Sequence, residues 1–135
     1  MGFNGDTPDL EAWRLRVEED RRANEERRAR DKEQRERAEA KAREILIEYL
    51  DDVQLASFEA SGEFTVIGAD GYQYLIVDTQ HHNVFRIEDG KQTHMYCITV
   101  DGFIPEYDQM LAQMLLLQAN PEMFHRITNT WKMGE

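Results

Sequence analysis

The pattern of apolar and polar positions divides the chain into two parts. Residues 18–44 alternate Arg/Lys with Glu/Asp and contain no apolar side chain larger than alanine. No hydrophobic core can form around such a segment. The sequence Thr7-Pro8-Asp9 is typical of a helix start, and neither glycine nor proline appears again until Gly62. We therefore expect one charged helix over residues 8–50, about 60 Å long at 1.5 Å per residue.

Oppositely charged side chains four positions apart support this helix. They occur in both orders, as in Glu33/Arg37 and Lys32/Glu36. Each pair contributes only about 0.2–0.5 kcal/mol, but many such pairs among good helix formers hold a helix without a core. A coiled coil is less favoured than a lone charged helix or one lying on another subunit's polar surface. Its seam needs large apolar residues, whereas this segment offers only alanines.

Large apolar residues return at both ends of the predicted helix. Leu10, Trp13 and Val17 have the spacing i, i+3 and i+7, which places them on one face. A second apolar group follows at residues 45–50, where the helix meets the rest of the chain. Exposed tryptophan with aliphatic neighbours commonly marks a contact surface. We expect Leu10, Trp13 and Val17 to bind a partner protein.

The periodicity changes to two after a short helix over residues 53–60, which Asp51 or Asp52 caps and Ser61-Gly62 ends. Alternating segments then predict a sheet. The predicted strands and turns are residues 64–67, a turn at 68–71, residues 72–77, residues 84–87, a turn at 88–91 and residues 93–100. The turns contain Asp-Gly, a strong hairpin signal. Four strands in an antiparallel meander are the economical arrangement.

Two helices are predicted at the end of the chain. Asp108 caps the first, over residues 109–119, and Asn120-Pro121 starts the second, over residues 122–131. The first is apolar almost all round, so we expect it to be buried or partly shared with a partner. Core filling is the favoured role for Met110 and Met114, and a contact face for a partner is the alternative. In the second, Phe124, Ile127 and Trp131 form the packing stripe. The predicted fold class is α+β.

Charge follows the same division of the chain. Residues 1–44 have 12 basic and 13 acidic side chains, a balance of −1, and residues 45–135 have 4 and 14, a balance of −10. We predict a charged helical arm over residues 1–44 and a small acidic α+β domain over residues 45–135. The net charge of −11 argues against nucleic-acid binding, because phosphate contacts need a basic surface. No segment has the length of a membrane span, and the single cysteine excludes an internal disulfide.

Candidate catalytic and metal-binding residues have structural explanations. His94 and Cys97 lie three apart on a predicted strand, so their side chains point to opposite faces and cannot share a metal ion or a proton. His81-His82 falls in a predicted loop, and metal binding there needs His94 or His125 nearby. The carboxylates Asp101, Glu106 and Asp108 fit capping and turn roles. We therefore assign no catalytic residue, no metal site and no cofactor.

Several segments resemble a small family of uncharacterised bacterial and phage proteins, in which a strand with Tyr-Cys precedes a Met-Leu-Ala-Gln helix. The resemblance covers residues 46–128. It is carried by Phe64-Thr65-Val66, Asn83-Val84-Phe85-Arg86, Tyr96-Cys97, residues 110–117 and Phe124. It implies a compact α+β module and brings no catalytic residues.

The sequence favours a non-enzymatic structural or assembly protein. We expect a multi-copy virion component of a phage, such as a capsid, neck or tail accessory, made in the host cytoplasm. If it is not part of a virion, we expect it to be cytoplasmic. Its partners would be protein subunits, including copies of itself. One alternative is an acidic mimic of nucleic acid that binds a basic host protein, with affinity sensitive to salt. Another is a small hydrolase or metal enzyme that uses Cys97 and a histidine.

Overall fold

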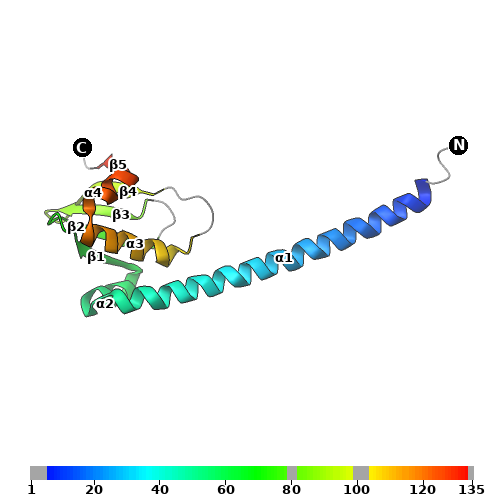
Figure 1. The fold of residues 1–135 in the computed structure, drawn as a ribbon, viewed down its shortest axis with the longest axis horizontal. Helices are drawn as coiled ribbons and strands as arrows, with labels where there is room; N and C mark the ends of the chain where they lie inside the picture. The colour runs from blue at the N-terminus through cyan, green and yellow to red at the C-terminus, as the bar shows by residue number, and fades with distance from the viewer. Residues whose placement is uncertain (1–5, 79–81, 99–103, 134–135) are drawn as a thin grey trace. The chain divides into compact units, whose positions relative to one another are not determined.

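The computed structural model describes residues 6–78, 82–98 and 104–133. Within these ranges the chain has an α+β fold with helices α1 to α4 and an antiparallel sheet of strands β1 to β5 (Figure 1). The elements in chain order are α1 Asp6–Tyr49, α2 Asp52–Ser61, β1 Glu63–Ile67, β2 Gln73–Val77, β3 Val84–Glu88, β4 Lys91–Cys97, α3 Glu106–Ala119, α4 Pro121–Ile127 and β5 Asn129–Lys132. The predicted α+β class and the long charged N-terminal helix are confirmed.

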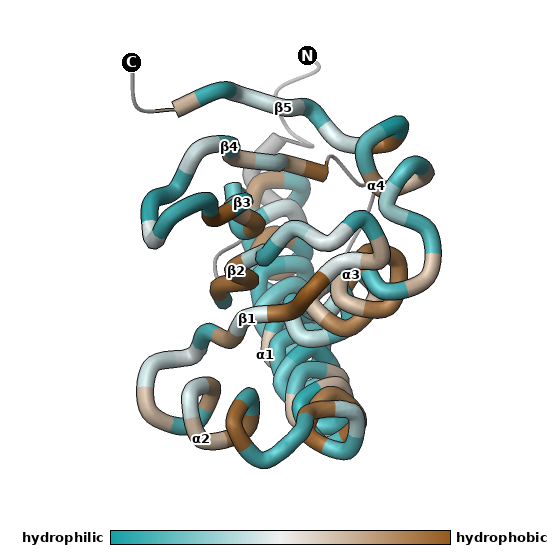
Figure 2. The backbone as a smooth tube through the Cα atoms, turned by 90° about the vertical axis from the view of Figure 1, so that its left-hand side faces the viewer, coloured by the Kyte–Doolittle hydropathy of each residue, from teal (hydrophilic) through white to brown (hydrophobic). Residues whose placement is uncertain are grey.

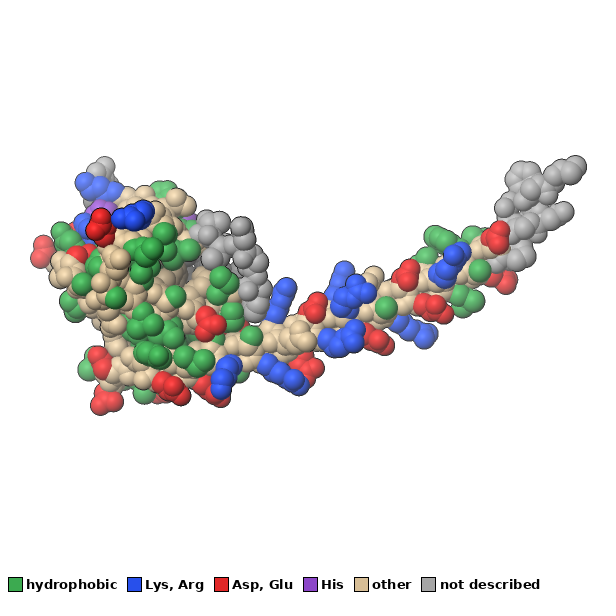
Figure 3. Space-filling view, in the orientation of Figure 1, with side chains coloured by type: hydrophobic (Ala, Val, Ile, Leu, Met, Phe, Trp, Pro, Cys, Tyr) green, Lys and Arg blue, Asp and Glu red, His purple; other side chains and the backbone are tan. Residues whose placement is uncertain are grey.

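The chain divides into two compact units, Met1–Arg37 and Ala38–Glu135, and α1 contributes to both. In the first unit every side chain of residues 9–37 is exposed. Figure 3 shows acidic and basic side chains interspersed along this part of the helix. The predicted pairs Glu33/Arg37 and Lys32/Glu36 are present. This unit therefore holds its helix through local charge pairs and helix propensity rather than a core.

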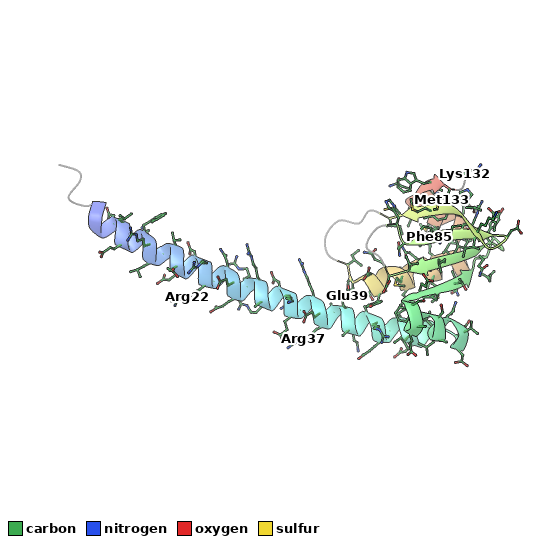
Figure 4. The ribbon with its side chains drawn as sticks, turned by 180° about the vertical axis from the view of Figure 1, so that it is seen from behind. Arg22, Arg37, Glu39, Phe85, Lys132 and Met133 are labelled. Carbon is green, nitrogen blue, oxygen red and sulfur yellow. The ribbon has the colours of Figure 1, made fainter. Side chains whose placement is uncertain are left out.

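The second unit begins within α1, earlier than the predicted domain boundary at residues 44/45. Ala42 and Leu46 are buried. Glu39 accepts a hydrogen bond from the backbone N–H of Glu106 at 2.6 Å, and Figure 4 shows Glu39 beside the start of α3. The last turns of α1 thus belong to the packed unit, because an alanine at position 42 is small enough to let the helix approach its neighbours.

The sheet follows the predicted meander, in the order β1-β2-β3-β4-β5. The β3–β4 hairpin turns on Asp89 and Gly90, both with positive φ (53° and 77°), as a two-residue hairpin turn requires. At the β1 edge, the Gln54 side-chain amide of α2 donates to the carbonyl oxygen of Thr65 at 2.8 Å. The Ser57 hydroxyl donates to the carbonyl oxygen of Glu63 at 2.7 Å. Helix α2 therefore covers the outer carbonyls of β1.

The fifth strand corrects the prediction at the C-terminal end. Helix α4 ends at Ile127, Thr128 is extended (φ −104°, ψ 152°), and Trp131 lies on β5 opposite Met95 of β4. The predicted helix over residues 122–131 is thus too long. Thr128, Asn129 and Thr130 are poor helix formers, and the Thr128 hydroxyl donates to the carbonyl oxygen of Phe124 at the helix end. Of the predicted packing stripe only Phe124 is buried, since Ile127 and Trp131 are exposed.

Helices α3 and α4 pack on one face of the sheet, and the core that they form with it also includes Leu46 of α1 and Phe58 of α2. Figure 2 shows the hydrophobic segments of α3 beside those of β1 and β2, while α1 is largely hydrophilic. The core residues are Leu46, Phe58, Phe64, Val66, Tyr74, Ile76, Val84, Tyr96, Met110, Met114, Leu117 and Phe124. Met110 and Met114 are 0% and 1% exposed. Their predicted role as a partner contact is wrong, because they face their own sheet.

Helix starts agree with the sequence in two cases and differ in two. Asp51 and Gln54 form a capping box on α2, and Asn120 caps α4 with Pro121 at its first position, both as predicted. Helix α1 begins at Asp6, before Thr7. Helix α3 begins at Glu106, so Asp108 lies in its first turn and does not cap it. The carboxylate of Glu39, distant in sequence, takes over this role.

Candidate functional site

The apolar stripe of α1, defined by Leu10, Trp13 and Val17, is exposed in the first unit. These side chains are 49%, 55% and 45% exposed. At 3.6 residues per turn, each position advances by about 100°, so the three lie within a narrow sector of the helix. Leu15 is 65% exposed but lies on the opposite side of the helix. Arg14 and Arg16 flank the stripe, one on each side.

A single helix cannot bury its own apolar stripe. Of the residues that the structure describes, those of the first unit all belong to α1, so no other described element of this unit covers the stripe. A tryptophan between two aliphatic side chains has the chemistry of a helix that docks in a groove. The arrangement suits protein recognition, with Trp13 as the anchor.

A polar cluster in the second unit links a turn, a strand and a helix. The Tyr74 hydroxyl donates to Asp70 Oδ2 at 2.6 Å and lies 3.2 Å from His125 Nε2. His125 Nε2 is 3.7 Å from Asp70 Oδ2. Burial, together with the hydrogen bond to Asp70, raises the pKa of Tyr74 far above its ordinary value. Tyr74 therefore stays a neutral hydrogen-bond donor and ties the β1–β2 turn to α4.

A second group of polar residues crosses the sheet beside this cluster. Arg86 and His94 are register partners on β3 and β4, and the Arg86 guanidinium lies 4.2 Å from the Tyr72 ring centroid. Arg86 Nη2 contacts Glu88 at 3.3 Å and is 3.5 Å from His94 Nε2. Burial and the charge of Arg86 lower the pKa of His94. Arg86 Nε is buried with no hydrogen-bond partner in the described part of the chain.

These two groups have the geometry of a structural network. Tyr74 is completely buried and Tyr96 nearly so, at 2% exposure, so neither hydroxyl presents itself to a substrate. Arg86 already faces the carboxylate of Glu88, and His125 faces that of Asp70. The network therefore joins β2, β3, β4 and α4. The sequence did not indicate it, because its members come from four separate segments and match no motif spacing.

Within the described residues, the side chains considered as catalytic or metal-binding candidates do not come together in one site. His94 stacks on Tyr96, with ring centroids 6.3 Å apart, which places it on the face opposite to the buried Cys97, as its strand position predicts. His82 contacts the Trp131 ring, whereas His81 and Asp101 lie outside the described residues. Among the residues that the structure describes, no three His, Cys, Asp or Glu side chains are placed to hold a metal ion.

An apolar groove lies beside α3, and no pattern in the sequence indicated it. Asp108, Ala112 and Leu116 line it at four-residue spacing on α3, and Ile98 and Ile127 line it from outside this helix. Ile104, Gln109 and Gln113 are the other described residues that line it. The cavity volume is about 220 Å³. In Figure 3 hydrophobic side chains gather over this part of the second unit. We call these eight residues the α3 groove.

Comparison with known proteins found no match to a protein-family model, to a curated protein or to a solved structure. In the ranges that the structure describes, no helix has the combined length and hydrophobicity needed to cross a membrane.

Proposed function

We propose that this protein is a non-enzymatic assembly protein that binds neighbouring protein subunits, copies of itself included, through the apolar stripe of α1. The observation that carries the proposal is the exposure of Trp13, at 55%, between Leu10 and Val17 on a helix in which residues 9–37 are all exposed. A large aromatic side chain buries 150–250 Å² when covered, roughly, so covering it stabilises a contact strongly. We place the protein in a multi-copy assembly, and a phage virion is the setting that we propose.

The charge pattern of α1 supports a binding role. The first unit has 10 basic and 11 acidic side chains, nearly balanced, so the helix can approach a partner without strong net repulsion. The salt-bridged helix is already formed, which reduces the conformational entropy lost on binding. A preformed helix with one apolar stripe is therefore suited to docking.

The test compares two truncations of apolar side chains on the same helix. Trp13→Ala removes the centre of the stripe, and Leu15→Ala removes a similarly exposed apolar side chain from the opposite side. We expect Trp13→Ala to weaken self-association of the full chain by about 2 kcal/mol, measured by sedimentation, while Leu15→Ala leaves it unchanged. The thermal unfolding of the second unit should stay the same in both variants.

A fluorescence measurement checks that Trp13 itself becomes buried. The chain has two tryptophans, so Trp131→Phe leaves Trp13 as the single reporter. Its emission should shift to shorter wavelength as the chains associate. If Trp13 stays in water in the associated state, or if both alanine variants associate like the wild type, the proposed function is wrong.

A further inference from the structure

Strand β5 is the last strand of the described sheet, and its pairing with β4 brings a basic side chain beside a histidine. Lys132 is the register partner of His94, and His94 is in turn the register partner of Arg86 on β3. Register partners in an antiparallel pair have their side chains on the same face of the sheet. Arg86, His94 and Lys132 therefore form one row across β3, β4 and β5, with the titratable residue in the middle.

The outer pair of this row is a close one. The backbone N–H of Met133 donates to the carbonyl oxygen of Thr93 at 2.8 Å, and Figure 4 shows Met133 beside Lys132 at the end of β5. Hydrogen-bonded and non-hydrogen-bonded pairs alternate along an antiparallel ladder, so His94 and Lys132 form a non-hydrogen-bonded pair. The Cα atoms of such a pair are only about 4.5 Å apart, which makes the two side chains direct neighbours.

The contacts of His94 require a neutral imidazole. Its Nε2 lies 3.5 Å from Arg86 Nη2, and its Nδ1 lies 2.9 Å from the hydroxyl oxygen of Thr93. A guanidinium has donors only, so Nε2 faces it as an unprotonated acceptor and Nδ1 carries the proton. The Tyr96 ring, which stacks on His94, brings no charge, because burial raises the pKa of the Tyr96 hydroxyl. Protonation of Nε2 would place two N–H groups and two positive charges against each other.

Charged groups on the neighbouring elements act on the protonation of His94. Burial, followed by the charge of Arg86, lowers the pKa of His94. The carboxylate of Glu88 on β3 opposes this effect, but it already contacts Arg86 at 3.3 Å. Lys132 on β5 and His125 on α4 lower the pKa further. The folded state therefore binds this proton more weakly than the unfolded state. The resulting stabilisation is fully present above the ordinary pKa of 6.5 and is lost as the pH falls through the folded-state pKa.

Strand β5 is the element that can yield to the repulsion. In the described sheet, β3 is paired on both sides, whereas β5 is paired with β4 alone. All four residues of β5 are exposed, so little apolar burial holds this strand in place. A positive charge on His94 is therefore relieved where Lys132 moves away from it, which requires loss of the β4–β5 pairing.

We infer that β5 is an acid-sensitive strand, which pairs with β4 while His94 is neutral and is released when His94 is protonated between Arg86 and Lys132. The pairing of β1, β2, β3 and β4 is retained, and β4 becomes the edge of the described sheet. None of the three residues belongs to the stripe of α1, so this inference is independent of the proposed function.

Hydrogen exchange of single backbone amides, followed by NMR on the full chain, tests the release. The Met133 amide reports on the β4–β5 pairing, and the Val77 amide, which donates to the carbonyl oxygen of Asn83 at 2.8 Å, reports on the β2–β3 side of the sheet. Protection factors, which are corrected for the intrinsic effect of pH on exchange, are compared at about pH 7.5 and about pH 5. At the lower pH we expect the protection of Met133 to fall about two- to fivefold, because opposed like charges destabilise a strand pair by this much. The protection of Val77 should stay the same.

Two variants remove the repulsion, each from one side of the pair. His94→Gln keeps a polar side chain that gains no charge in acid, and Lys132→Gln removes the neighbouring charge. In both variants we expect the protection of Met133 to be equal at the two pH values. His82→Gln is the matched control, since it replaces another histidine, which contacts the Trp131 ring of β5 but lies outside the row. It should keep the fall seen in the wild type. Circular dichroism at about pH 7.5 should show that all three variants are folded.

Three results would overturn the inference. The first is a protection of Met133 that does not change between the two pH values in the wild type. The second is a fall in His94→Gln or in Lys132→Gln as large as in the wild type, because the repulsion would then come from other groups. The third is an equal fall at Val77, because the whole sheet would then lose stability rather than β5 alone. A fall that is confined to Met133, absent from both row variants and kept in His82→Gln supports the inference.

Discussion

The carboxylate of Glu39 accepts a hydrogen bond from the backbone N–H of Glu106 at 2.6 Å, although the two residues are 67 positions apart. The first N–H groups of a helix have no acceptor within the helix. The side chain of Pro105, which precedes α3, has no hydrogen-bond acceptor and so cannot cap it. Glu39 therefore completes the start of α3 and ties it to the last part of α1. This contact belongs to the second unit, which begins at Ala38.

Removal of this carboxylate should destabilise the second unit. We expect Glu39→Ala to lower the free energy of unfolding by about 1 kcal/mol, because a helix cap contributes about this much. Glu44→Ala is the control, since Glu44 is exposed on the same helix. Urea unfolding followed by circular dichroism measures both. Equal stability of the two variants would show that the contact contributes nothing.

The stability of the second unit should depend on the protonation of Glu106. Burial, followed by the charges of Asp78 and Glu39, raises the pKa of Glu106 above its ordinary value of 4.5. The folded state therefore binds this proton more tightly than the unfolded state. The resulting stabilisation is fully present below the ordinary pKa and is lost as the pH rises through the folded-state pKa.

The change Glu106→Gln removes this titration. We expect the variant to gain thermal stability relative to the wild type as the pH rises from about 4 to about 7. Glu59→Gln changes an exposed carboxylate on α2 and serves as the control. Thermal unfolding across this pH range measures the difference. A constant difference between Glu106→Gln and the wild type would contradict the raised pKa.

The hydroxyl of Tyr74 should contribute to stability through Asp70 and His125. Tyr74→Phe keeps the ring in the core but leaves these two side chains without their shared partner. We expect a loss of about 1–3 kcal/mol in the free energy of unfolding. Tyr72→Phe is the matched control, because Tyr72 is 40% exposed and its ring still lies under Arg86. If Tyr74→Phe and Tyr72→Phe lost the same free energy of unfolding, the hydrogen bonds of the Tyr74 hydroxyl would not contribute to stability.

Truncation should show where the second unit begins. A fragment that starts at Ala38 retains Glu39, Ala42 and Leu46, so we expect it to unfold cooperatively at the wild-type temperature. A fragment that starts at residue 45 lacks the cap of α3 and the buried Ala42, so it should fold with lower stability. Calorimetry of the two fragments measures this. Identical unfolding would place the boundary at residues 44/45.

Local signals in the sequence were sufficient for most elements of the fold. The Asp51 cap with Gly62, the Asp89-Gly90 turn and Asn120-Pro121 each act over a few residues, and all three lie where they were predicted. Strand β5 was missed because Phe124 and Ile127 at helical spacing favoured a longer helix. Pairing with β4 overrides that helical pattern. It brings Trp131 opposite Met95, which is distant in the sequence.

The stripe of α1 and the α3 groove also differ in whether the sequence alone reveals them. The stripe of α1 is readable from sequence because Leu10, Trp13 and Val17 lie on one continuous helix. The α3 groove is not readable, because Ile98, Ala112 and Ile127 come from three segments. One of its lining residues, Gln113, is hydrogen-bonded to Asn83, which lies 30 positions away in the sequence. Convergence of distant segments leaves no periodicity in the chain, so only the folded structure reveals it.

The side chains of Gln54 and Ser57 bind the outer carbonyls of β1, and this has a consequence for the edge of the sheet wherever many copies of the chain lie close together. An uncovered strand edge is a template on which another chain adds a strand, and such addition leads to aggregation. Helix α2 occupies that template at β1. The other end of the described sheet is β5, a strand of only four residues with Lys132 at its end, and short, charged edges resist strand addition. Copies of the chain that lie close together can then associate through their side chains, because neither described edge of the sheet favours the addition of a strand from another copy.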